Sequence, residues 1–241
     1  MKDFSQLIDE AKEIFDIHIS DSNFQLLEAF ADYFAESNEK YNLSGIKDVS
    51  DIRKKLFLDS ISCLPVIKGL ENIKAIDVGT GAGFPGMVIK ILLRDINFTL
   101  VDSVGKKTIF LEETATLLGL NGLNVIKERA ETLGHDPDHR ERYDLVFARA
   151  LAKMPVMLEY LLPLTAIGGY VIAQRGSETR QEVANIDKLI DRLGGEVEEV
   201  VPVEIPGLTE RYIVKIRKVG QTPDKYPRRV GVPKKNPLQN I

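Results

Sequence analysis

Four glycines stand close together in the stretch AIDVGTGAGFPG, residues 75–86, directly after an apolar run. Glycines at such a point allow a tight turn from strand to helix and a close approach of the backbone to a ligand. Counted from Gly81, GAGFPG fits the pattern G-x-G-x-x-G of dinucleotide sites. An NAD-dependent oxidoreductase is therefore one candidate function.

Two acids near the turn bear on which nucleoside would bind. Asp77 precedes Gly79 by two residues, so the stretch also reads D-x-G-x-G-x-G. A carboxylate there would repel a pyrophosphate and suits a phosphate-free ligand with a cationic end, such as S-adenosylmethionine. Asp102, at the end of the next apolar run, suits the ribose of either ligand. The order of strand, acid, turn, helix, strand and acid predicts a nucleoside cofactor, and Asp77 favours S-adenosylmethionine.

Charge is unevenly distributed along the chain, whose net charge is −4. Residues 211–235 hold nine Lys and Arg against one Asp, a net +8 that leaves −12 for the rest. A basic segment on an acidic body is typical of an RNA-binding or phosphate-binding edge, although each lysine taken singly is a common solvated charge. The residues predicted to neutralise RNA phosphates are Lys106, Lys107, Arg228, Arg229, Lys234 and Lys235.

Other chemistries have little support in the sequence. The single cysteine, Cys63, cannot form an intramolecular disulfide and is predicted to be a small buried residue. His135 and His139 stand four apart in HDPDH, but Pro137 between them argues against one regular helix, and we expect a loop without a metal. The N-terminus lacks the basic and apolar regions of a signal peptide, which predicts a cytoplasmic protein without a membrane segment.

The elements that would position these residues change in kind near residue 73. Residues 1–72 read as an N-terminal helical extension of three amphipathic helices, with Ser20 or Asp21 capping the second and Asp48 or Ser50 the third. The polar face of the third is expected to include residues 53–55.

From Ile73 onward, β-like runs alternate with amphipathic segments, which predicts a mainly parallel sheet with helices on both faces. The last two runs are expected to form an antiparallel pair added to that sheet. Residues 73–220 are predicted to be the catalytic domain and 221–241, with four prolines, a basic, extended and irregular tail. The predicted strands are IKAIDVG, NFTLVDS, LNVIKE, YDLVFARA, GYVIAQR, EVEEVVPVEI and RYIVKIRK.

Several stretches together resemble one protein family. YNLSGI, DVGTGAGFPGMVIKI, FTLVDSVGKKTIFLEE, ERAETL, YDLVFARAL and YPRRVGVPKKNPL occur in this order over almost the whole chain. The chain is thereby similar to the RsmG family, also called glucose-inhibited division protein B. Its members are bacterial S-adenosylmethionine-dependent methyltransferases that form N7-methylguanosine in 16S rRNA of the small ribosomal subunit. The resemblance implies a class I, Rossmann-like methyltransferase fold with a mixed, mostly parallel seven-stranded sheet, and a monomer that needs no metal.

The resemblance also implies a set of cofactor contacts. It assigns Arg149 to the end of the fourth strand beside the cofactor, where its guanidinium would serve catalysis by holding guanine O6, a phosphate or the methionine carboxylate. A surface arginine paired with Asp144 is the alternative for Arg149. Phe84 would cover the methyl donor or simply pack in the core. The implied contacts are Gly79 and Phe84 on the turn, Asp102, Ser103 and Val104 at the ribose and adenine edge, Ala130 and Glu131 beside the adenine, with Asp77, Gly81 and Gly83 in the same pocket by position.

Two residues depart from the family pattern. Phe57 in LFLDS stands where the family usually has histidine, and Ser44 in YNLSG where threonine is commoner. The methyl-transfer chemistry itself is compatible with the residues present, because guanine N7 carries no proton and methylation needs no general base. Orientation of the two reactants would supply the catalysis. A ribosome-binding or RNA-binding module without turnover is the non-enzymatic alternative.

Overall fold

The structure is a computed structural model that describes residues 4–67, 69 and 73–239. These residues contain a seven-stranded sheet in the order β3-β2-β1-β4-β5-β7-β6. Strands β1 to β5 run parallel, and β7 is antiparallel to both β5 and β6. Every predicted strand is present, and the terminal antiparallel pair is confirmed. The strands are β1 (Lys74–Val78), β2 (Asn97–Asp102), β3 (Leu123–Lys127), β4 (Tyr143–Arg149), β5 (Thr165–Arg175), β6 (Gly195–Val203) and β7 (Arg211–Lys218).

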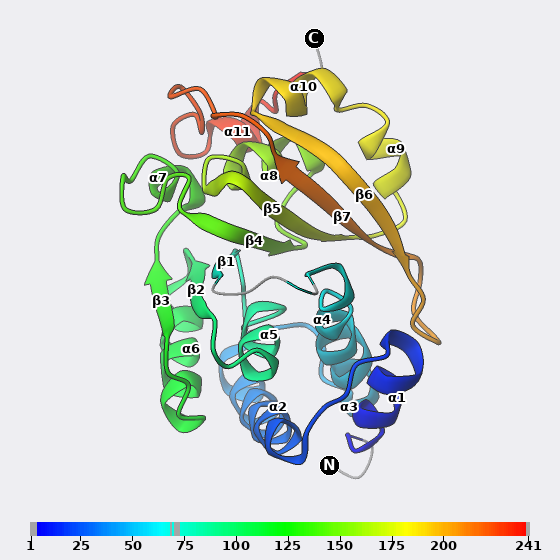
Figure 1. The fold of residues 1–241 in the computed structure, drawn as a ribbon. Helices are drawn as coiled ribbons and strands as arrows, with labels where there is room; N and C mark the ends of the chain where they lie inside the picture. The colour runs from blue at the N-terminus through cyan, green and yellow to red at the C-terminus, as the bar shows by residue number, and fades with distance from the viewer. Residues whose placement is uncertain (1–3, 68, 70–72, 240–241) are drawn as a thin grey trace.

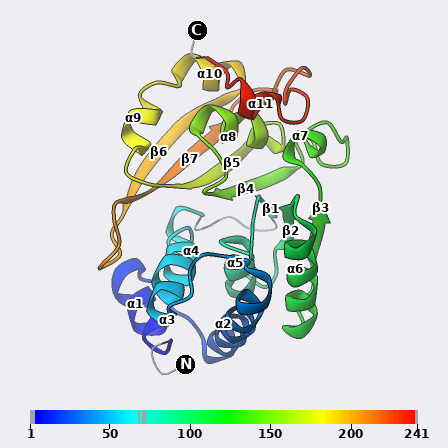
Figure 2. The same cartoon turned by 180° about the vertical axis from the view of Figure 1, so that it is seen from behind.

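Helices cover both faces of the sheet, as Figures 1 and 2 show from opposite sides. Below the sheet in both views lie α1 (Gln6–Phe15), α2 (Asp21–Tyr41), α3 (Val49–Ile52), the π-helix η1 (Arg53–Leu58), α4 (Asp59–Ile61), the 3₁₀-helix η2 (Pro65–Ile67), α5 (Gly86–Leu92) and α6 (Gly105–Leu117). Above it lie α7 (Ala130–Leu133), α8 (Met154–Leu161), α9 (Thr179–Val183), α10 (Asp187–Arg192) and α11 (Val232–Lys235). In the described part of the chain, no helix has the length and apolar composition needed to cross a membrane.

The alternation of side chains along the strands produces two hydrophobic cores. Ala75 and Phe147 face the N-terminal helices, whereas their neighbours Ile76 and Val146 face α8. Successive strand residues point to opposite faces, so a strand covered on both sides is apolar throughout. Cys63 is fully buried in the first core, as predicted. The carboxyl ends of β1, β2 and β4 emerge between these two cores.

The predicted third helix is divided into α3, η1 and α4. Of the predicted caps, Ser20 accepts from the Asn23 amide for α2, and Asp48 accepts from the Asp51 amide for α3. The assignment of Arg53 to the polar face is wrong. Its side chain is buried and its Nε lies 3.0 Å from Glu10 Oε2, because α1 packs against η1 and supplies the acid. The predicted boundary at residue 72 lies outside the described residues.

The C-terminal segment differs from the extended, irregular tail that its prolines predict. Residues 232–235 form the helical turn α11, which packs on α8. Thr222 and Tyr226 are buried. The segment is ordered by side chains of other elements that bind its backbone, an effect that local composition does not reveal. Residues 240 and 241 of the predicted tail lie outside the described ones.

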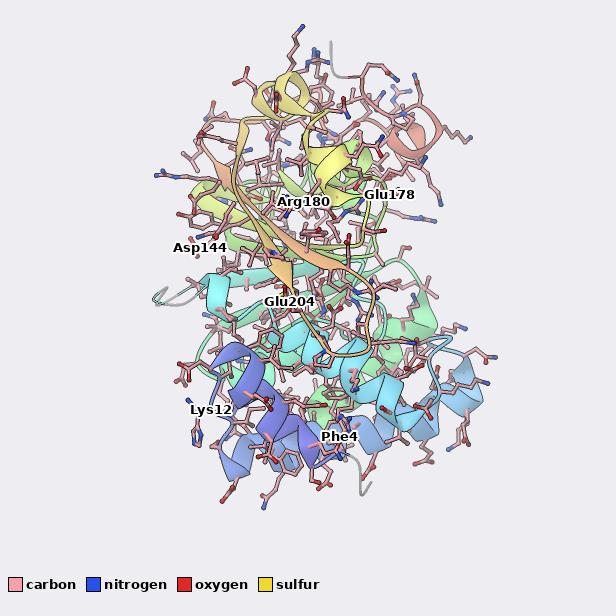
Figure 3. The ribbon with its side chains drawn as sticks, turned by 90° about the vertical axis from the view of Figure 1, so that its right-hand side faces the viewer. Phe4, Lys12, Asp144, Glu178, Arg180 and Glu204 are labelled. Atoms are coloured by element: carbon pink, nitrogen blue, oxygen red, sulfur yellow. The ribbon has the colours of Figure 1, made fainter. Side chains whose placement is uncertain are left out.

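The connection between β6 and β7 reaches the N-terminal helices. Figure 3 shows Glu204, just beyond β6, at a level between Phe4 of the N-terminal region and Arg180 of α9. Lys54 Nζ donates to the Pro206 carbonyl at 3.2 Å, which joins this connection to η1. The start of β7 is thereby held close to η1 and α4.

Candidate active site

Two cavities lie at the carboxyl ends of the central strands and share Ala150. The first has a volume of about 290 Å³ and the second about 240 Å³. Ligands of open α/β sheets bind at this edge. The first is lined by Val78, Gly79, Val101, Asp102, Ser103, Val104, Lys107, Glu128, Arg129, Ala130, Glu131, Ala150 and Leu151, and the second by Asp59, Arg149, Ala150, Gln174, Arg175, Gly176 and Arg211.

Many of the predicted cofactor contacts meet in the first cavity. Gly79 lines it with φ +71, and a Cβ there would lie 2.4 Å from Leu151 Cδ1, so a side chain at this position would fill the entrance to the turn. Asp102 is held from both sides, because Gly81 N donates to its Oδ2 at 3.0 Å and Val104 N to its Oδ1 at 2.9 Å. These bonds fix the Asp102 carboxylate at the end of β2. The predicted residues that line this cavity are Gly79, Asp102, Ser103, Val104, Lys107, Ala130 and Glu131.

Asp77 lies behind the glycine turn rather than in the cavity lining. Its carboxylate is fully buried, and Oδ2 accepts from Thr80 Oγ1 at 2.7 Å and from Gly86 N at 2.9 Å. Burial raises the Asp77 pKa to about 6, against the lowering effect of these two hydrogen bonds. A Cβ on Gly86 would lie 2.9 Å from both Asp77 Cβ and Oδ2, so glycine is required for this contact. Asp77 thus fastens the turn to the start of α5.

Phe84 belongs to an aromatic cluster under the turn. Its ring centroid lies 5.1 Å from Phe30, 5.5 Å from Phe34 and 5.2 Å from Phe57. Of the two predicted alternatives for Phe84, this geometry favours packing. Gly83 lies against the same cluster, because a Cβ there would be 3.4 Å from the Phe30 ring. Phe57, the departure from the family pattern, is fully buried here.

Arg149 points into the second cavity. Its Nε lies 3.2 Å from Asp59 Oδ2, so its ion-pair partner is Asp59 of α4 and not Asp144, which accepts from the backbone amide of Lys74. Asp59 is buried and burial raises its pKa, while the charges of Arg149 and Arg211 lower it. The pair holds the guanidinium at the end of β4, beside both cavities.

Sequence reasoning missed several residues of the second cavity. Asp59 lies in a helix taken as structural, and Gln174 and Arg175 end a strand whose edge received no role. The Gln174 Nε2 atom donates to the Asp59 carbonyl at 2.6 Å, and Arg175 binds the Ala152 carbonyl at 2.6 Å. Their signal was positional, since both follow the buried run of β5 at its carboxyl end.

The two histidines of HDPDH make separate contacts in a loop. His135 Nε2 lies 2.5 Å from the Pro227 carbonyl, and His139 Nδ1 lies 2.6 Å from the Tyr143 hydroxyl. Among residues 4–67, 69 and 73–239, no group of three or more His, Cys, Asp or Glu side chains is arranged to hold a metal ion.

The predicted RNA-binding residues occupy different environments. Lys106 donates to the Tyr41 carbonyl at 2.6 Å, and Lys107 Nζ lies 3.5 Å from Asp102 Oδ2. Arg228 is committed to Glu159, with Nη2 2.7 Å from Oε2. The remaining three, Arg229, Lys234 and Lys235, are exposed.

Comparison with known proteins follows the whole chain. The family model "rRNA small subunit methyltransferase G" (GidB) matches residues 23–213. The ribosomal RNA small subunit methyltransferase G of Acetivibrio thermocellus is 43% identical over 234 residues, covering 97% of this chain and 96% of the relative. The protein of the same name from Roseiflexus castenholzii is 46% identical over 215 residues, covering 88% and 92%.

Solved structures with the same fold are more distant in sequence. A SAM-dependent methyltransferase from Aquifex aeolicus superposes with a TM-score of 0.54 at 20% identity, covering 77% of this chain and 98% of the other. A methyltransferase described as putative, from Bacillus halodurans, gives a TM-score of 0.51 at 14% identity, covering 68% and 100%. These similarities confirm the class I, Rossmann-like fold.

Proposed function

Because the chain belongs to the rRNA small subunit methyltransferase G family, we propose that it transfers a methyl group from S-adenosylmethionine to guanine N7 in 16S rRNA of the small ribosomal subunit. The observation that carries this proposal is the pair of adjoining cavities that share Ala150. One suits the methyl donor and the other the acceptor base. The protein would act in the cytoplasm as a monomer without a metal.

The first cavity fits a phosphate-free nucleoside donor. Asp102, with both oxygens oriented by backbone amides, suits the ribose hydroxyls. Acidic side chains outnumber basic ones in the lining, with Asp102, Glu128 and Glu131 against Lys107 and Arg129. Asp77 adds a buried carboxyl behind the turn. This charge balance favours a cationic sulfonium and opposes the pyrophosphate of NAD.

The second cavity suits the acceptor guanine. Its lining holds three arginines, Arg149, Arg175 and Arg211, and one acid, Asp59. Arginine donates well to guanine O6, and the negative phosphate of the target nucleotide would also be attracted. Asp59 keeps the Arg149 guanidinium in place through their ion pair.

Catalysis by this site would depend on orientation. Bound S-adenosylmethionine supplies a methyl group on a positively charged sulfur. The residues of the chain hold the ribose and the guanine, and no side chain has to remove a proton because N7 carries a lone pair. Orientation of this kind contributes roughly 7–11 kcal/mol in favourable cases. We assign the positioning of the guanine to Arg149.

RNA contact would come from exposed basic groups around these cavities. Arg229, Lys234 and Lys235 are exposed on the C-terminal segment, and Lys106 is exposed at the start of α6. Each phosphate neutralised adds to the affinity and to its salt dependence. The Arg228 guanidinium, already paired with Glu159, and Lys107, beside Asp102, would contribute less.

The test compares binding and turnover. We expect S-adenosylhomocysteine to bind at micromolar concentration by calorimetry while NAD does not bind; the reverse result would exclude this function. Labelled methyl groups should enter small-subunit rRNA at one guanine, located by mapping the product. Arg149→Lys should retain S-adenosylhomocysteine binding and lose about tenfold or more in kcat, since lysine cannot reproduce the planar fork. Wild-type protein that binds the cofactor but transfers no methyl to naked 16S rRNA or to 30S particles would favour the binding module.

A further inference from the structure

Residues 221–236, here called the strap, run over α7 and α8 at the top of Figure 1. Arg140, from the loop after α7, binds the strap backbone at two points. Its Nη1 donates to the Tyr226 carbonyl at 2.8 Å and its Nη2 to the Thr222 carbonyl at 2.7 Å. Since these bonds join separate segments, they fix the strap relative to α7.

A second anchor joins the strap to α8. Arg228 Nε lies 2.8 Å from Glu159 Oε1, Nη2 lies 2.7 Å from Oε2, and the Arg228 amide also donates to Oε1 at 2.8 Å. Glu159 is fully buried. A buried carboxylate requires such paired donors, and the two parallel bonds fix direction as well as distance. Glu159 in turn raises the Arg228 pKa.

The strap then reaches the first cavity. Gly231 N donates to Glu131 Oε1 at 2.9 Å, and the Tyr160 hydroxyl donates to the same oxygen at 3.0 Å. Glu131 is 5% exposed and lines the cavity near its adenine side. One of its oxygens is therefore fixed by a donor from the strap and a donor from α8.

We propose that the strap positions the Glu131 carboxylate to accept a hydrogen bond from the 6-amino group of the cofactor adenine, with Tyr160 and Arg228 as positioning residues. The inference rests on the proposed function, because it takes the first cavity to be the S-adenosylmethionine site. With Oε1 fixed by two donors, Oε2 is directed at the base. An amino group at position 6 distinguishes adenine from hypoxanthine, whose 6-oxo group would face the carboxylate unfavourably.

The experiment measures calorimetric dissociation constants for S-adenosylhomocysteine and for its 6-oxo analogue, S-inosylhomocysteine. Tyr160→Phe keeps the ring and removes one donor to Glu131, and Arg228→Lys keeps the charge beside Glu159 but loses the fork. We expect Tyr160→Phe to bind S-adenosylhomocysteine about tenfold more weakly and Arg228→Lys about threefold, with S-inosylhomocysteine little changed in both. The preference for adenine should fall accordingly.

Two variants serve as matched controls. Tyr143→Phe removes another buried hydroxyl, which contacts His139 instead of Glu131, and Arg217→Lys changes an exposed arginine of β7. Both should keep the wild-type constants for the two ligands. If Tyr160→Phe and Arg228→Lys lower the melting temperature but leave the adenine preference intact, the strap is purely structural and the inference is overturned. Wild-type protein that binds neither ligand would overturn the proposed function together with the inference.

Discussion

The first cavity is supported on its two sides by different kinds of contact. Beneath the glycine turn, Phe84 packs against Phe30, Phe34 and Phe57, with ring centroids 5.1–5.5 Å apart. On the adenine side, the strap is held by guanidinium groups and carboxylates, with Arg228 on Glu159 as the most buried pair. The turn is fixed by volume, and the adenine side is fixed by the direction of its hydrogen bonds.

This difference predicts different sensitivities. Aromatic packing is non-directional, so it tolerates changes of polarity poorly and depends on filled volume. A buried ion pair contributes little net stability but is costly when one partner is removed. The aromatic side should therefore respond most to truncation, and the strap side to loss of a single partner. Four variants test this contrast.

The largest effect should follow from Phe84→Ala. The ring is buried among three other aromatics, so its removal leaves a cavity that rigid neighbours cannot fill. We expect a loss of about 3–5 kcal/mol in unfolding free energy, measured by urea denaturation. A loss below about 1 kcal/mol would show that packing does not hold the turn.

Asp77→Asn tests the charge at the edge of the aromatic side. Burial raises the Asp77 pKa from 3.8 to about 6, so the folded protein retains a proton that the unfolded chain releases. Wild-type stability should therefore fall as pH rises from about 4 to 6 and level off above, by about 3 kcal/mol in total from this group. The variant should lack that slope in urea unfolding at pH 4, 5, 6 and 7. Equal slopes in both proteins would contradict the assignment.

On the strap side, Arg228→Met should cost about 2 kcal/mol, discounted for the partial exposure of the arginine. The loss arises because the Glu159 carboxylate stays buried without its partner. The double variant Arg228→Met with Glu159→Leu should recover most of the stability, since both charges are then absent. Thermal unfolding of the single and double variants gives the coupling. No recovery in the double variant would mean that the strap depends on shape as well.

Ala150→Gly should give the smallest change, at the boundary between the two cavities. Ala150 has φ +49, a conformation that costs an L-residue about 1–2 kcal/mol and costs glycine nothing. Because glycine loses more entropy on folding, we expect a net gain of about 0.5–1 kcal/mol in unfolding free energy. A loss of stability in urea titration would show that the methyl group of Ala150 packs favourably against the cavity wall.

The sequence predicted the fold and much of the first cavity because both depend on local pattern. Each strand has its own apolar run, and Asp77, Gly79 and Asp102 stand at the ends of two of them. Turn chemistry and the strand-end rule are sufficient to bring such residues to one edge.

The second cavity and the strap depend on contacts between distant segments, which pattern does not encode. Asp59 and Arg149 meet only because α4 packs below the carboxyl end of β4. Arg228 finds its carboxylate 69 residues earlier, in a helix whose sequence MPVMLEYL reads as apolar core with one acid. A charge in the sequence signals exposure on average, and only the tertiary structure identifies a buried partner.

The π-helix η1 fixes the length of the chain at this point as well as its composition. A π-turn holds one residue more than an α-turn, so it is equivalent to a single-residue insertion in an α-helix. Removing one residue between Arg53 and Leu58 would restore regular helix and rotate everything beyond it by about 100° about the helix axis. Asp59, the next residue, would then turn away from Arg149. Insertions and deletions in this segment are therefore expected to disrupt the acceptor cavity even where each neighbouring substitution is tolerated.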